Sequence, residues 1–362
     1  MKPTAILLTA LSALSLAAGP WDYKFPTREE NQAFFDAFGT KVIGQAPARV
    51  DPAMTVDSVE KADGYEIRHI SYNVDQGERI KAFLLVPDHQ PGEKLPLVCC
   101  LHPTSGGGKN VMLNRYPAPA ADAAEQLKRD NRANALELVK RGFVCFLPDR
   151  QGYGERAVIP GESDPVKNMK AAQEAFKVKY PGWHHTFGKV PADLSRALDE
   201  LLKLDFIDTA NIGTIGHSLG GWDSLYLWGT DPRVKAAVVN SGGAHWIVND
   251  MWLNQKWRLK FVEGTESIKP NTDCSAQVFI MMGAPKPLLY MRGIREAGTD
   301  YGSCPVNNVR LIREYYGTFG DNPYRINGKN QFAAFFHDEG HDFPVYARQL
   351  AYSWLEQQLK KQ

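Results

Sequence analysis

The sequence predicts an α/β domain with a mostly parallel central sheet, helices on both of its faces and an N-terminal antiparallel hairpin. Near the start, residues 66–72 alternate between polar and apolar side chains, and a second run follows at 80–86. They flank the turn sequence Asp75-Gln76-Gly77-Glu78, a pattern typical of a hairpin. After residue 97, short apolar runs alternate with segments of helical periodicity, which indicates consecutive β-α-β units.

The remaining elements are predicted in chain order. A polar N-terminal extension, 19–64, contains a short helix near 29–38 and packs on the domain at 65–362. Continuous apolar runs predict strands buried on both faces. The predicted strands span 97–101, 143–147, 212–216, 234–239, 286–291 and 332–336, and the predicted helices span 121–141, 192–204, 219–228 and 344–359. Stretches near 242–285 and 294–328, rich in aromatic residues and Asn, are interpreted as insertions over one end of the sheet.

Composition excludes some classes of function. The formal net charge of the 362-residue chain is +1, so no overall field attracts nucleic acid or an anionic membrane. With 43% hydrophobic and 23% charged residues and no repeat, the chain is expected to fold as one globular domain.

The first 18 residues are predicted to form a secretory signal peptide. Met1-Lys2 is a positively charged start, and an apolar run extends from Ala5 to Ala18. Ser15 and Ala17 form the small-x-small pattern of a cleavage site. The run is too short to span a membrane comfortably. We therefore expect a secreted or periplasmic mature protein without stable membrane association.

The five cysteines fall into two groups. Cys99, Cys100 and Cys145 lie in apolar runs, where a thiol behaves as a small buried hydrophobe. Cys274 and Cys304 flank one predicted strand and can pair in an oxidising compartment, a question that sequence spacing leaves open.

The strongest functional signal is Gly216-His217-Ser218-Leu219-Gly220, between a predicted strand and a predicted helix. At such a junction the chain turns so sharply that the serine adopts a strained backbone conformation, and the glycines avoid clashes around it. The hydroxyl is then presented at the end of the sheet, beside the unpaired N–H groups of a helix N-terminus. Ser218 is the predicted nucleophile; the structural alternative is that it only caps the helix.

Together these features resemble the α/β-hydrolase superfamily from about Tyr65 to Leu359. Within it, the chain resembles the secreted bacterial acetyl xylan esterase and dienelactone-hydrolase-like group. The stretches that carry the resemblance are Leu101-His102-Pro103-Thr104 with the following Gly106-Gly107-Gly108-Lys109, residues 148–156, and Gly340-His341-Asp342-Phe343-Pro344. The resemblance implies a serine hydrolase.

A serine hydroxyl needs a neighbouring base, because it is a poor nucleophile at neutral pH. His341 lies in the loop between the last predicted strand and the last helix, where the superfamily's chain order places this base. His337, at the strand end, is the competing candidate. The loop position and the preceding glycine favour His341.

The acid that orients the base is one of two residues. Glu296 lies three positions after Gly293, which matches the family's Gly-x-x-acid spacing. Asp300 lies shortly before Cys304-Pro305 and matches the acid that usually precedes a proline there. The two cues separate in this chain, so both residues remain candidates.

The oxyanion donors are predicted to be the backbone N–H groups of Leu219 and Thr104. The glycines that follow, 106–108, lack the Gly-x-x-x-x-Gly-Lys-Ser/Thr pattern of a phosphate loop and are interpreted as part of a loop on the oxyanion side. No grouping of His, Glu or Cys has metal-ligand spacing, and the chemistry needs no cofactor.

The expected function is a serine carboxylic-ester hydrolase that works through an acyl-enzyme on a small ester or an acylated carbohydrate. Export and the resemblance imply an ester outside the cytoplasm, such as an acetyl group on xylan. Loop aromatics can form a sugar platform or simply anchor the loops. These aromatics are Trp183, Trp246, Trp252, Trp257 and Tyr301.

Two other classes of function share the fold. A prolyl-oligopeptidase-like serine peptidase is disfavoured, because the region before Tyr65 is too short for the propeller domain of those enzymes. A non-catalytic binding protein is disfavoured, because both the serine and the histidine motifs are intact.

Overall fold

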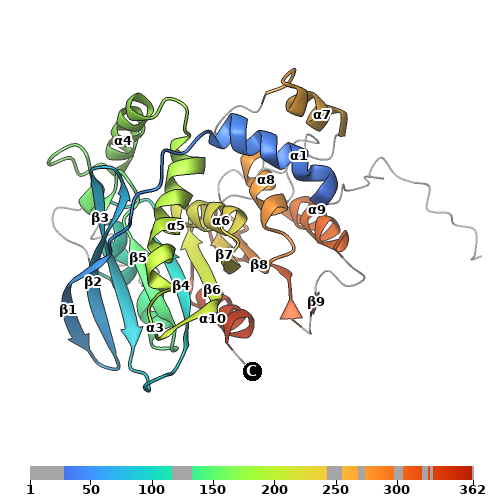
Figure 1. Ribbon diagram of the computed structural model, residues 1–362. Helices are drawn as coiled ribbons and strands as arrows, with labels where there is room; N and C mark the ends of the chain where they lie inside the picture. The colour runs from blue at the N-terminus through green and yellow to red at the C-terminus, as the bar shows by residue number, and fades with distance from the viewer. Residues whose placement is uncertain are drawn as a thin grey trace, which may run out of the picture.

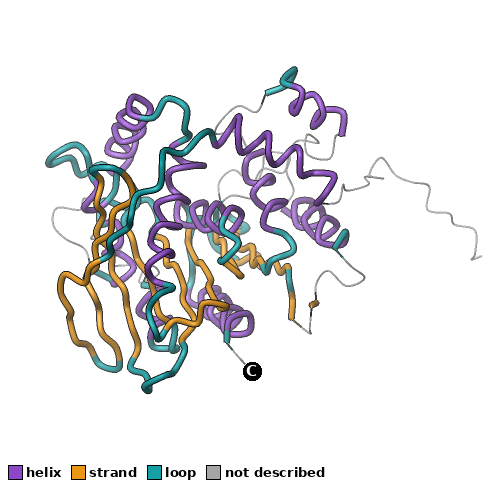
Figure 2. Tube along the Cα trace, viewed as in Figure 1, coloured by secondary structure: helices purple, strands orange, loops and turns teal. Residues whose placement is uncertain are grey.

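The computed structural model describes residues 28–115, 133–242, 255–267, 274–296, 305–319, 325–326 and 329–360. Within these residues, nine strands form one sheet in the order β1-β2-β3-β5-β4-β6-β7-β8-β11 (Figure 1). Figure 2 shows the strands as one twisted layer with helices in front of it and behind it. The predicted signal segment, Asp300 and Cys304 lie outside the described residues.

The sheet changes from antiparallel to parallel along its width. Strands β1, β2, β3 and β5 pair antiparallel, and the pairs from β5 through β4 to β11 are parallel. The strands are β1 (Thr55–Ala62), β2 (Tyr65–Asp75), β3 (Glu78–Pro87), β4 (Leu95–Leu101), β5 (Val144–Pro148), β6 (Ile207–His217), β7 (Val234–Asn240), β8 (Leu288–Gly293) and β11 (Phe332–His337), with β9 (Arg325–Ile326) and β10 (Lys329–Asn330) as a separate pair. The predicted fold class, with its N-terminal hairpin, is confirmed.

Helices follow the parallel strands, as the alternating pattern predicts. They are α1 (Arg28–Phe38), α3 (Asn134–Val139), α4 (Pro165–Lys179), α5 (Val190–Leu201), α6 (Leu219–Thr230), α7 (Gln255–Glu263), α8 (Cys274–Gly283), α9 (Pro305–Gly317) and α10 (Val345–Leu359). Short helical turns are η1 (Gly39–Ile43), η2 (Gly108–Leu113), η3 (Gly154–Arg156) and η4 (His185–Lys189). None of the helices described is long and apolar enough to cross a membrane.

Two hydrophobic layers hold the sheet between its helices. Successive side chains of a strand point to opposite faces, so the apolar run of β4 supplies both layers. Cys99 lies in the layer under α5, α6 and α8, and Cys100 lies in the layer under α3 and α10. Both thiols are fully buried, as is Cys145, which confirms their predicted core positions. Burial raises the pKa of the Cys99 thiol.

Several described elements were not predicted from the sequence, among them β1 and α4. Strand β1 lies at the sheet edge, within the predicted N-terminal extension, and most of its side chains are exposed. With no buried face, β1 has no hydrophobic alternation to detect. Helix α4 buries only Asn168, Ala172 and Phe176, but Asp164 caps it by accepting from two backbone N–H groups. The pair Asp164-Pro165 at its start is the sequence signal from which this helix could have been predicted.

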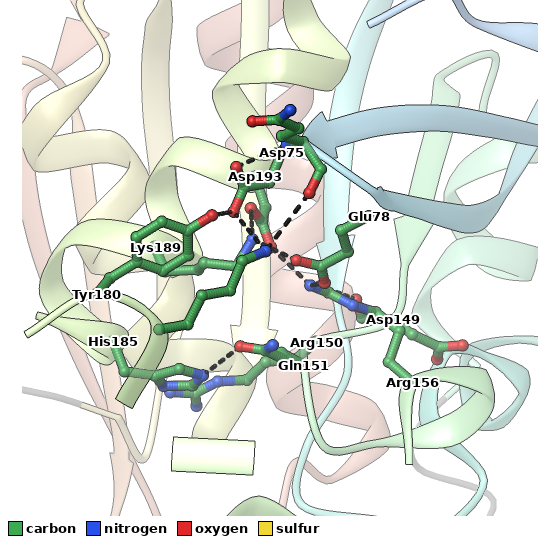
Figure 3. Close-up of polar contacts among 12 residues, drawn as sticks. Asp75, Glu78, Asp149, Arg150, Gln151, Arg156, Tyr180, His185, Lys189 and Asp193 are labelled. Atoms are coloured by element: carbon green, nitrogen blue, oxygen red, sulfur yellow. Dashed lines mark hydrogen bonds and ion pairs between the residues drawn. The ribbon is translucent and has the colours of Figure 1, made fainter. Parts of the chain in front are cut away.

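A buried ionic network fastens the β2–β3 hairpin to helix α5 (Figure 3). Arg156 donates to Asp193 at 2.8 Å and also pairs with Glu78. Lys189 bridges the same two carboxylates, at 2.8 Å to each. Burial alone would raise the pKa of Glu78, but the charges of Arg156 and Lys189 lower it to about 2. Each charge in this network therefore has a partner of opposite sign.

A second buried pair joins the segment after β4 to the loop after β5. The Lys109 Nζ donates to one oxygen of Asp149 at 2.6 Å, and the Lys109 backbone N–H donates to the other at 2.7 Å. The two side chains are 1% and 0% exposed. Gly108 and Gly154 lie so close to this carboxylate that an added Cβ would come within 2.1 and 2.4 Å of it. The pair therefore holds the loop that leads from Thr104 against its neighbour.

We predict that Lys109→Met lowers the free energy of unfolding by about 3–5 kcal/mol, because it leaves the Asp149 carboxylate buried without its cation. Lys81→Met is the matched control. It breaks only the exposed Lys81–Glu155 pair, whose side chains are 65% and 47% exposed, and should cost less than about 1 kcal/mol. Urea unfolding of the two variants measures the difference. Equal losses would show that the buried pair does not stabilise these loops.

Candidate active site

Ser218 occupies the sharp turn that the Gly-x-Ser-x-Gly pattern predicts. Strand β6 ends at His217 and helix α6 begins at Leu219, and between them Ser218 has φ 55° and ψ −117°. A non-glycine residue in such a conformation stores about 1–3 kcal/mol of strain. The Ser218 N–H donates to the Asn240 carbonyl at 2.9 Å, so strand β7 helps to hold the turn.

The glycines of the pattern allow three backbone segments to approach one another. A Cβ on Gly216 would lie 2.1 Å from the carbonyl oxygen of Gly220. A Cβ on Gly220 would lie 2.0 Å from the carbonyl oxygen of Leu101, at the end of β4. Both positions therefore exclude any side chain.

The structure brings His341 and Glu296 to Ser218. The Nε2 of His341 lies 2.8 Å from Ser218 Oγ, and its Nδ1 lies 2.6 Å from Glu296 Oε1. With Nδ1 protonated and donating to the carboxylate, Nε2 is free of its proton and accepts from the serine hydroxyl. The imidazole is about half exposed, whereas the Glu296 side chain is 11% exposed.

Two adjacent loops carry the imidazole and the carboxylate. Glu296 follows β8 and His341 follows β11, the parallel strand beside it. Backbone bonds join the loops, because Ile294 N–H donates to the His337 carbonyl and Arg295 N–H donates to the Glu339 carbonyl, both at 2.9 Å. Of the two sequence candidates for the acid, the structure therefore places Glu296 against the imidazole. Asp300 lies outside the described residues.

His337, the competing base candidate, contacts Asn240 and, among the described residues, has no hydrogen bond with the serine. It is buried, and its Nε2 lies 3.2 Å from the Asn240 side-chain oxygen. The same amide donates from its nitrogen to the Asp342 carbonyl and to His217 Nδ1, both at 2.8 Å. Asn240 thus links the ends of β6 and β11 to the loop that carries His341.

The two predicted oxyanion donors lie on elements that meet at Ser218. Leu219 is the first residue of α6, so its N–H has no acceptor within the helix. Thr104 is half-buried in the segment after β4. Within that segment His102 accepts from the Arg150 N–H at 3.1 Å, and its other nitrogen lies 2.8 Å from the Pro103 carbonyl. The role of the two N–H groups as oxyanion donors stays a prediction.

The structure describes the side chain of one of the aromatic residues proposed as a sugar platform. Trp183 is buried, and its ring packs against Phe176 and Tyr180 at centroid distances of 5.4 and 5.8 Å. It therefore anchors its own loop, which is the alternative that the sequence left open. Trp246, Trp252 and Tyr301 lie outside the described residues, as does the side chain of Trp257. Among the described residues, no group of three His, Cys, Asp or Glu side chains is arranged to hold a metal ion.

Comparison with known proteins identifies the fold of the chain. No family model matches it. YtaP of Bacillus subtilis, a presumed hydrolase, is 22% identical over 288 residues, which cover 79% of this chain and 88% of that protein. A glucuronoyl esterase from Solibacter usitatus superposes with a TM-score of 0.56 at 17% identity, over 91% of this chain and 92% of that one. The chain has the α/β-hydrolase fold.

A second structure of this fold agrees over nearly the whole chain. The acetyl xylan esterase from Paenibacillus sp. R4 has a TM-score of 0.51 at 17% identity and covers 93% of this chain and 96% of its own. At such identities the likeness establishes the α/β-hydrolase fold, and the reaction must be argued from the residues at Ser218.

Three charged side chains near this site were missed from the sequence. Arg292 lies 3.5 Å from Glu296 Oε2 and is buried, so a positive charge faces the carboxylate. The spacing of four residues between them was the available signal. Arg150, after β5, lies 3.3 Å from Asp223, in the second turn of α6, and both are buried. Burial raises the pKa of Asp223 to about 6, although Arg150 opposes this shift. No local sequence pattern relates Arg150 to Asp223, so their contact could not be predicted.

The adjacent histidines 184 and 185 have structural partners. The Nδ1 of His184 accepts from the backbone N–H groups of Thr186 and Phe187, at 3.1 Å each, and so caps η4. Its ring stacks on Phe187. His185 lies 2.8 Å from the Gln151 side-chain oxygen. Burial lowers the pKa of His184 to about 4, because the charged ring would lose its hydration.

We predict that His184 makes the fold sensitive to acid. The unfolded chain protonates this ring near pH 6.5 and the folded chain only near pH 4, so stability falls as the pH drops between those values. His184→Asn keeps an acceptor at the cap and removes the titration. The loss of unfolding free energy between pH 7 and pH 5 should then be smaller by about 2 kcal/mol. Urea unfolding at both pH values measures it, and an unchanged loss would contradict the assignment.

Proposed function

We propose that the chain is a serine carboxylic-ester hydrolase that works through an acyl-enzyme on Ser218. The observation that carries the proposal is the continuous hydrogen-bonded series from Glu296 through His341 to Ser218, with distances of 2.6 and 2.8 Å. A nucleophile, a base and a group that orients the base are the parts that acyl transfer requires. Their chain order, serine before acid before histidine, is that of the α/β-hydrolases.

The mechanism follows from this geometry. As Ser218 Oγ attacks the ester carbonyl carbon, its proton passes to His341 Nε2, and the carbonyl oxygen becomes an oxyanion facing the Leu219 and Thr104 N–H groups. The bond to the alcohol breaks, and His341 returns the proton to the departing oxygen. Water then attacks the acyl-enzyme by the same route, which releases the acid and restores Ser218.

Glu296 supports these steps without receiving the proton. Its carboxylate holds Nδ1–H and stabilises the imidazolium that forms when Nε2 is protonated. Arg292 lies 3.5 Å from the other carboxylate oxygen, so the carboxylate is held between the imidazole and a guanidinium.

The proposed substrate class is an acyl ester on plant polysaccharide, such as acetylated xylan. Similarly folded proteins include an acetyl xylan esterase and a glucuronoyl esterase, both of which are named for esters on carbohydrates. The predicted export signal in residues 1–18 would place the protein outside the cytoplasm, where such polymers are found. A serine peptidase with the same site is the alternative that the assays below separate.

The first prediction from this proposal concerns Ser218. The wild-type protein should hydrolyse small acyl esters, best at the acetyl end of a series from acetyl to octanoyl, and Ser218→Ala should lose about 10⁶ in kcat. Acetylated xylan, a methyl ester of glucuronate and a peptide anilide, assayed beside the series, separate the three substrate classes. If the alanine variant retains full activity, or if no ester reacts, the proposal is wrong.

The second prediction distinguishes the two acid candidates. Glu296→Gln should lower kcat by roughly 10⁴, because an amide cannot hold Nδ1–H in the required tautomer or stabilise the imidazolium. Asp300→Asn is the matched control, with the same loss of one carboxylate, and should leave kcat within about twofold of wild type. The reverse result would assign the acid to Asp300.

A further inference from the structure

A hollow of about 690 Å³ lies far from Ser218. Its walls come from the segment after η1, from helix α5 and from residues 230–233, the turn between α6 and β7. Helix α6 starts beside Ser218 and runs for 12 residues to Thr230, a length of about 18 Å. Residues 230–233 of the lining therefore lie at the end of α6 opposite Ser218, and Figure 1 shows the course of this helix.

Five charged residues line this hollow, and four of them form ion pairs with one another. Arg233 donates to both oxygens of Asp231, at 2.9 and 2.6 Å, and to Asp199 at 2.8 Å. Arg49 pairs with the other oxygen of Asp199. The fifth, Arg196, has no hydrogen bond and no ion pair with any of the described residues, and its Nε is fully buried. The hollow thus carries one positive charge in excess.

The environment of Arg196 is unfavourable for a cation. The residue is only 6% exposed, and burial, with the nearby charge of Arg49, lowers the pKa of its guanidinium, although the charges of Asp199, Asp193 and Asp75 oppose this shift. None of these carboxylates bonds to the guanidinium directly, so it loses hydration without gaining a hydrogen-bond acceptor, and a bound anion would supply one. The distance of the hollow from Ser218 means that the proposed catalytic mechanism does not account for this arginine.

The rest of the lining selects the kind of anion. Apolar side chains face the same space as the guanidinium groups: Ile43, Pro47, Phe187, Pro191, Pro232 and Met282. A single excess charge matches a monoanion, and these walls favour an apolar body over a fully hydrated ion. Arg presents a planar fork that matches a carboxylate through two parallel hydrogen bonds.

We propose that this hollow is a second binding site, which takes an organic carboxylate with an apolar body. The carboxylate faces Arg196 and Arg49, and the apolar part lies against Phe187 and Pro191. The site stands on its own observations and holds whether or not Ser218 is the nucleophile of an esterase.

Calorimetric titration with benzoate and with benzamide, its neutral counterpart, tests the proposal. Benzoate should bind saturably and at least about tenfold more tightly than benzamide, and Arg196→Gln should weaken benzoate by at least about tenfold. Lys203→Gln is the matched control. It removes one exposed positive charge just after α5 and should leave the affinity unchanged.

Three outcomes would overturn the proposal. They are an affinity for benzoate that Arg196→Gln leaves unchanged, equal affinities for benzoate and inorganic phosphate, and no binding of benzoate at all. The first of these includes binding at Ser218, which the arginine variant would not affect. If Arg196→Gln does not fold, Arg49→Gln replaces it, because Arg49 is 58% exposed, and the same loss of affinity is expected.

Discussion

The turn at Ser218 depends on a backbone approach so close that no side chain fits within it. Gly216 and Gly220 face each other across the turn, and the Gly220 Cα meets the Leu101 carbonyl at the end of β4. This contact aligns the ends of β4 and β6 with the start of α6. The segments that carry Thr104, Ser218 and Leu219 meet there, so the spacing of the candidate site follows from the absence of two Cβ atoms.

Buried charges hold the loops around this turn. Lys109 and Asp149 join the segment after β4 to the loop after β5, and Arg156 with its partners joins that loop to α5. Arg150 connects it to α6 through Asp223. Such pairs contribute little net stability compared with apolar residues, but each leaves an unpaired charge if its partner moves. They therefore fix loop positions more than they strengthen the fold.

Local patterns in the sequence were enough to predict most of the sheet, the turn at the serine and the histidine loop. Each depends on neighbouring residues, such as the glycines beside Ser218 or the apolar runs of the parallel strands. The choice between Glu296 and Asp300 required the packing of β8 against β11, which places Glu296 beside His341. Strand β1 was missed because its exposed side chains show no hydrophobic alternation, and the Arg150–Asp223 pair was missed because it joins positions far apart in the chain.

The backbone conformation at Ser218 places the stability of the fold in conflict with the presence of a hydroxyl at this position. With φ at 55°, position 218 has a conformation that glycine adopts without steric cost and serine does not. Replacing the serine with glycine would relieve strain, while the hydroxyl beside His341 would disappear. Selection for stability alone would therefore favour glycine at this position. Serine at this position carries a stability cost that glycine would avoid.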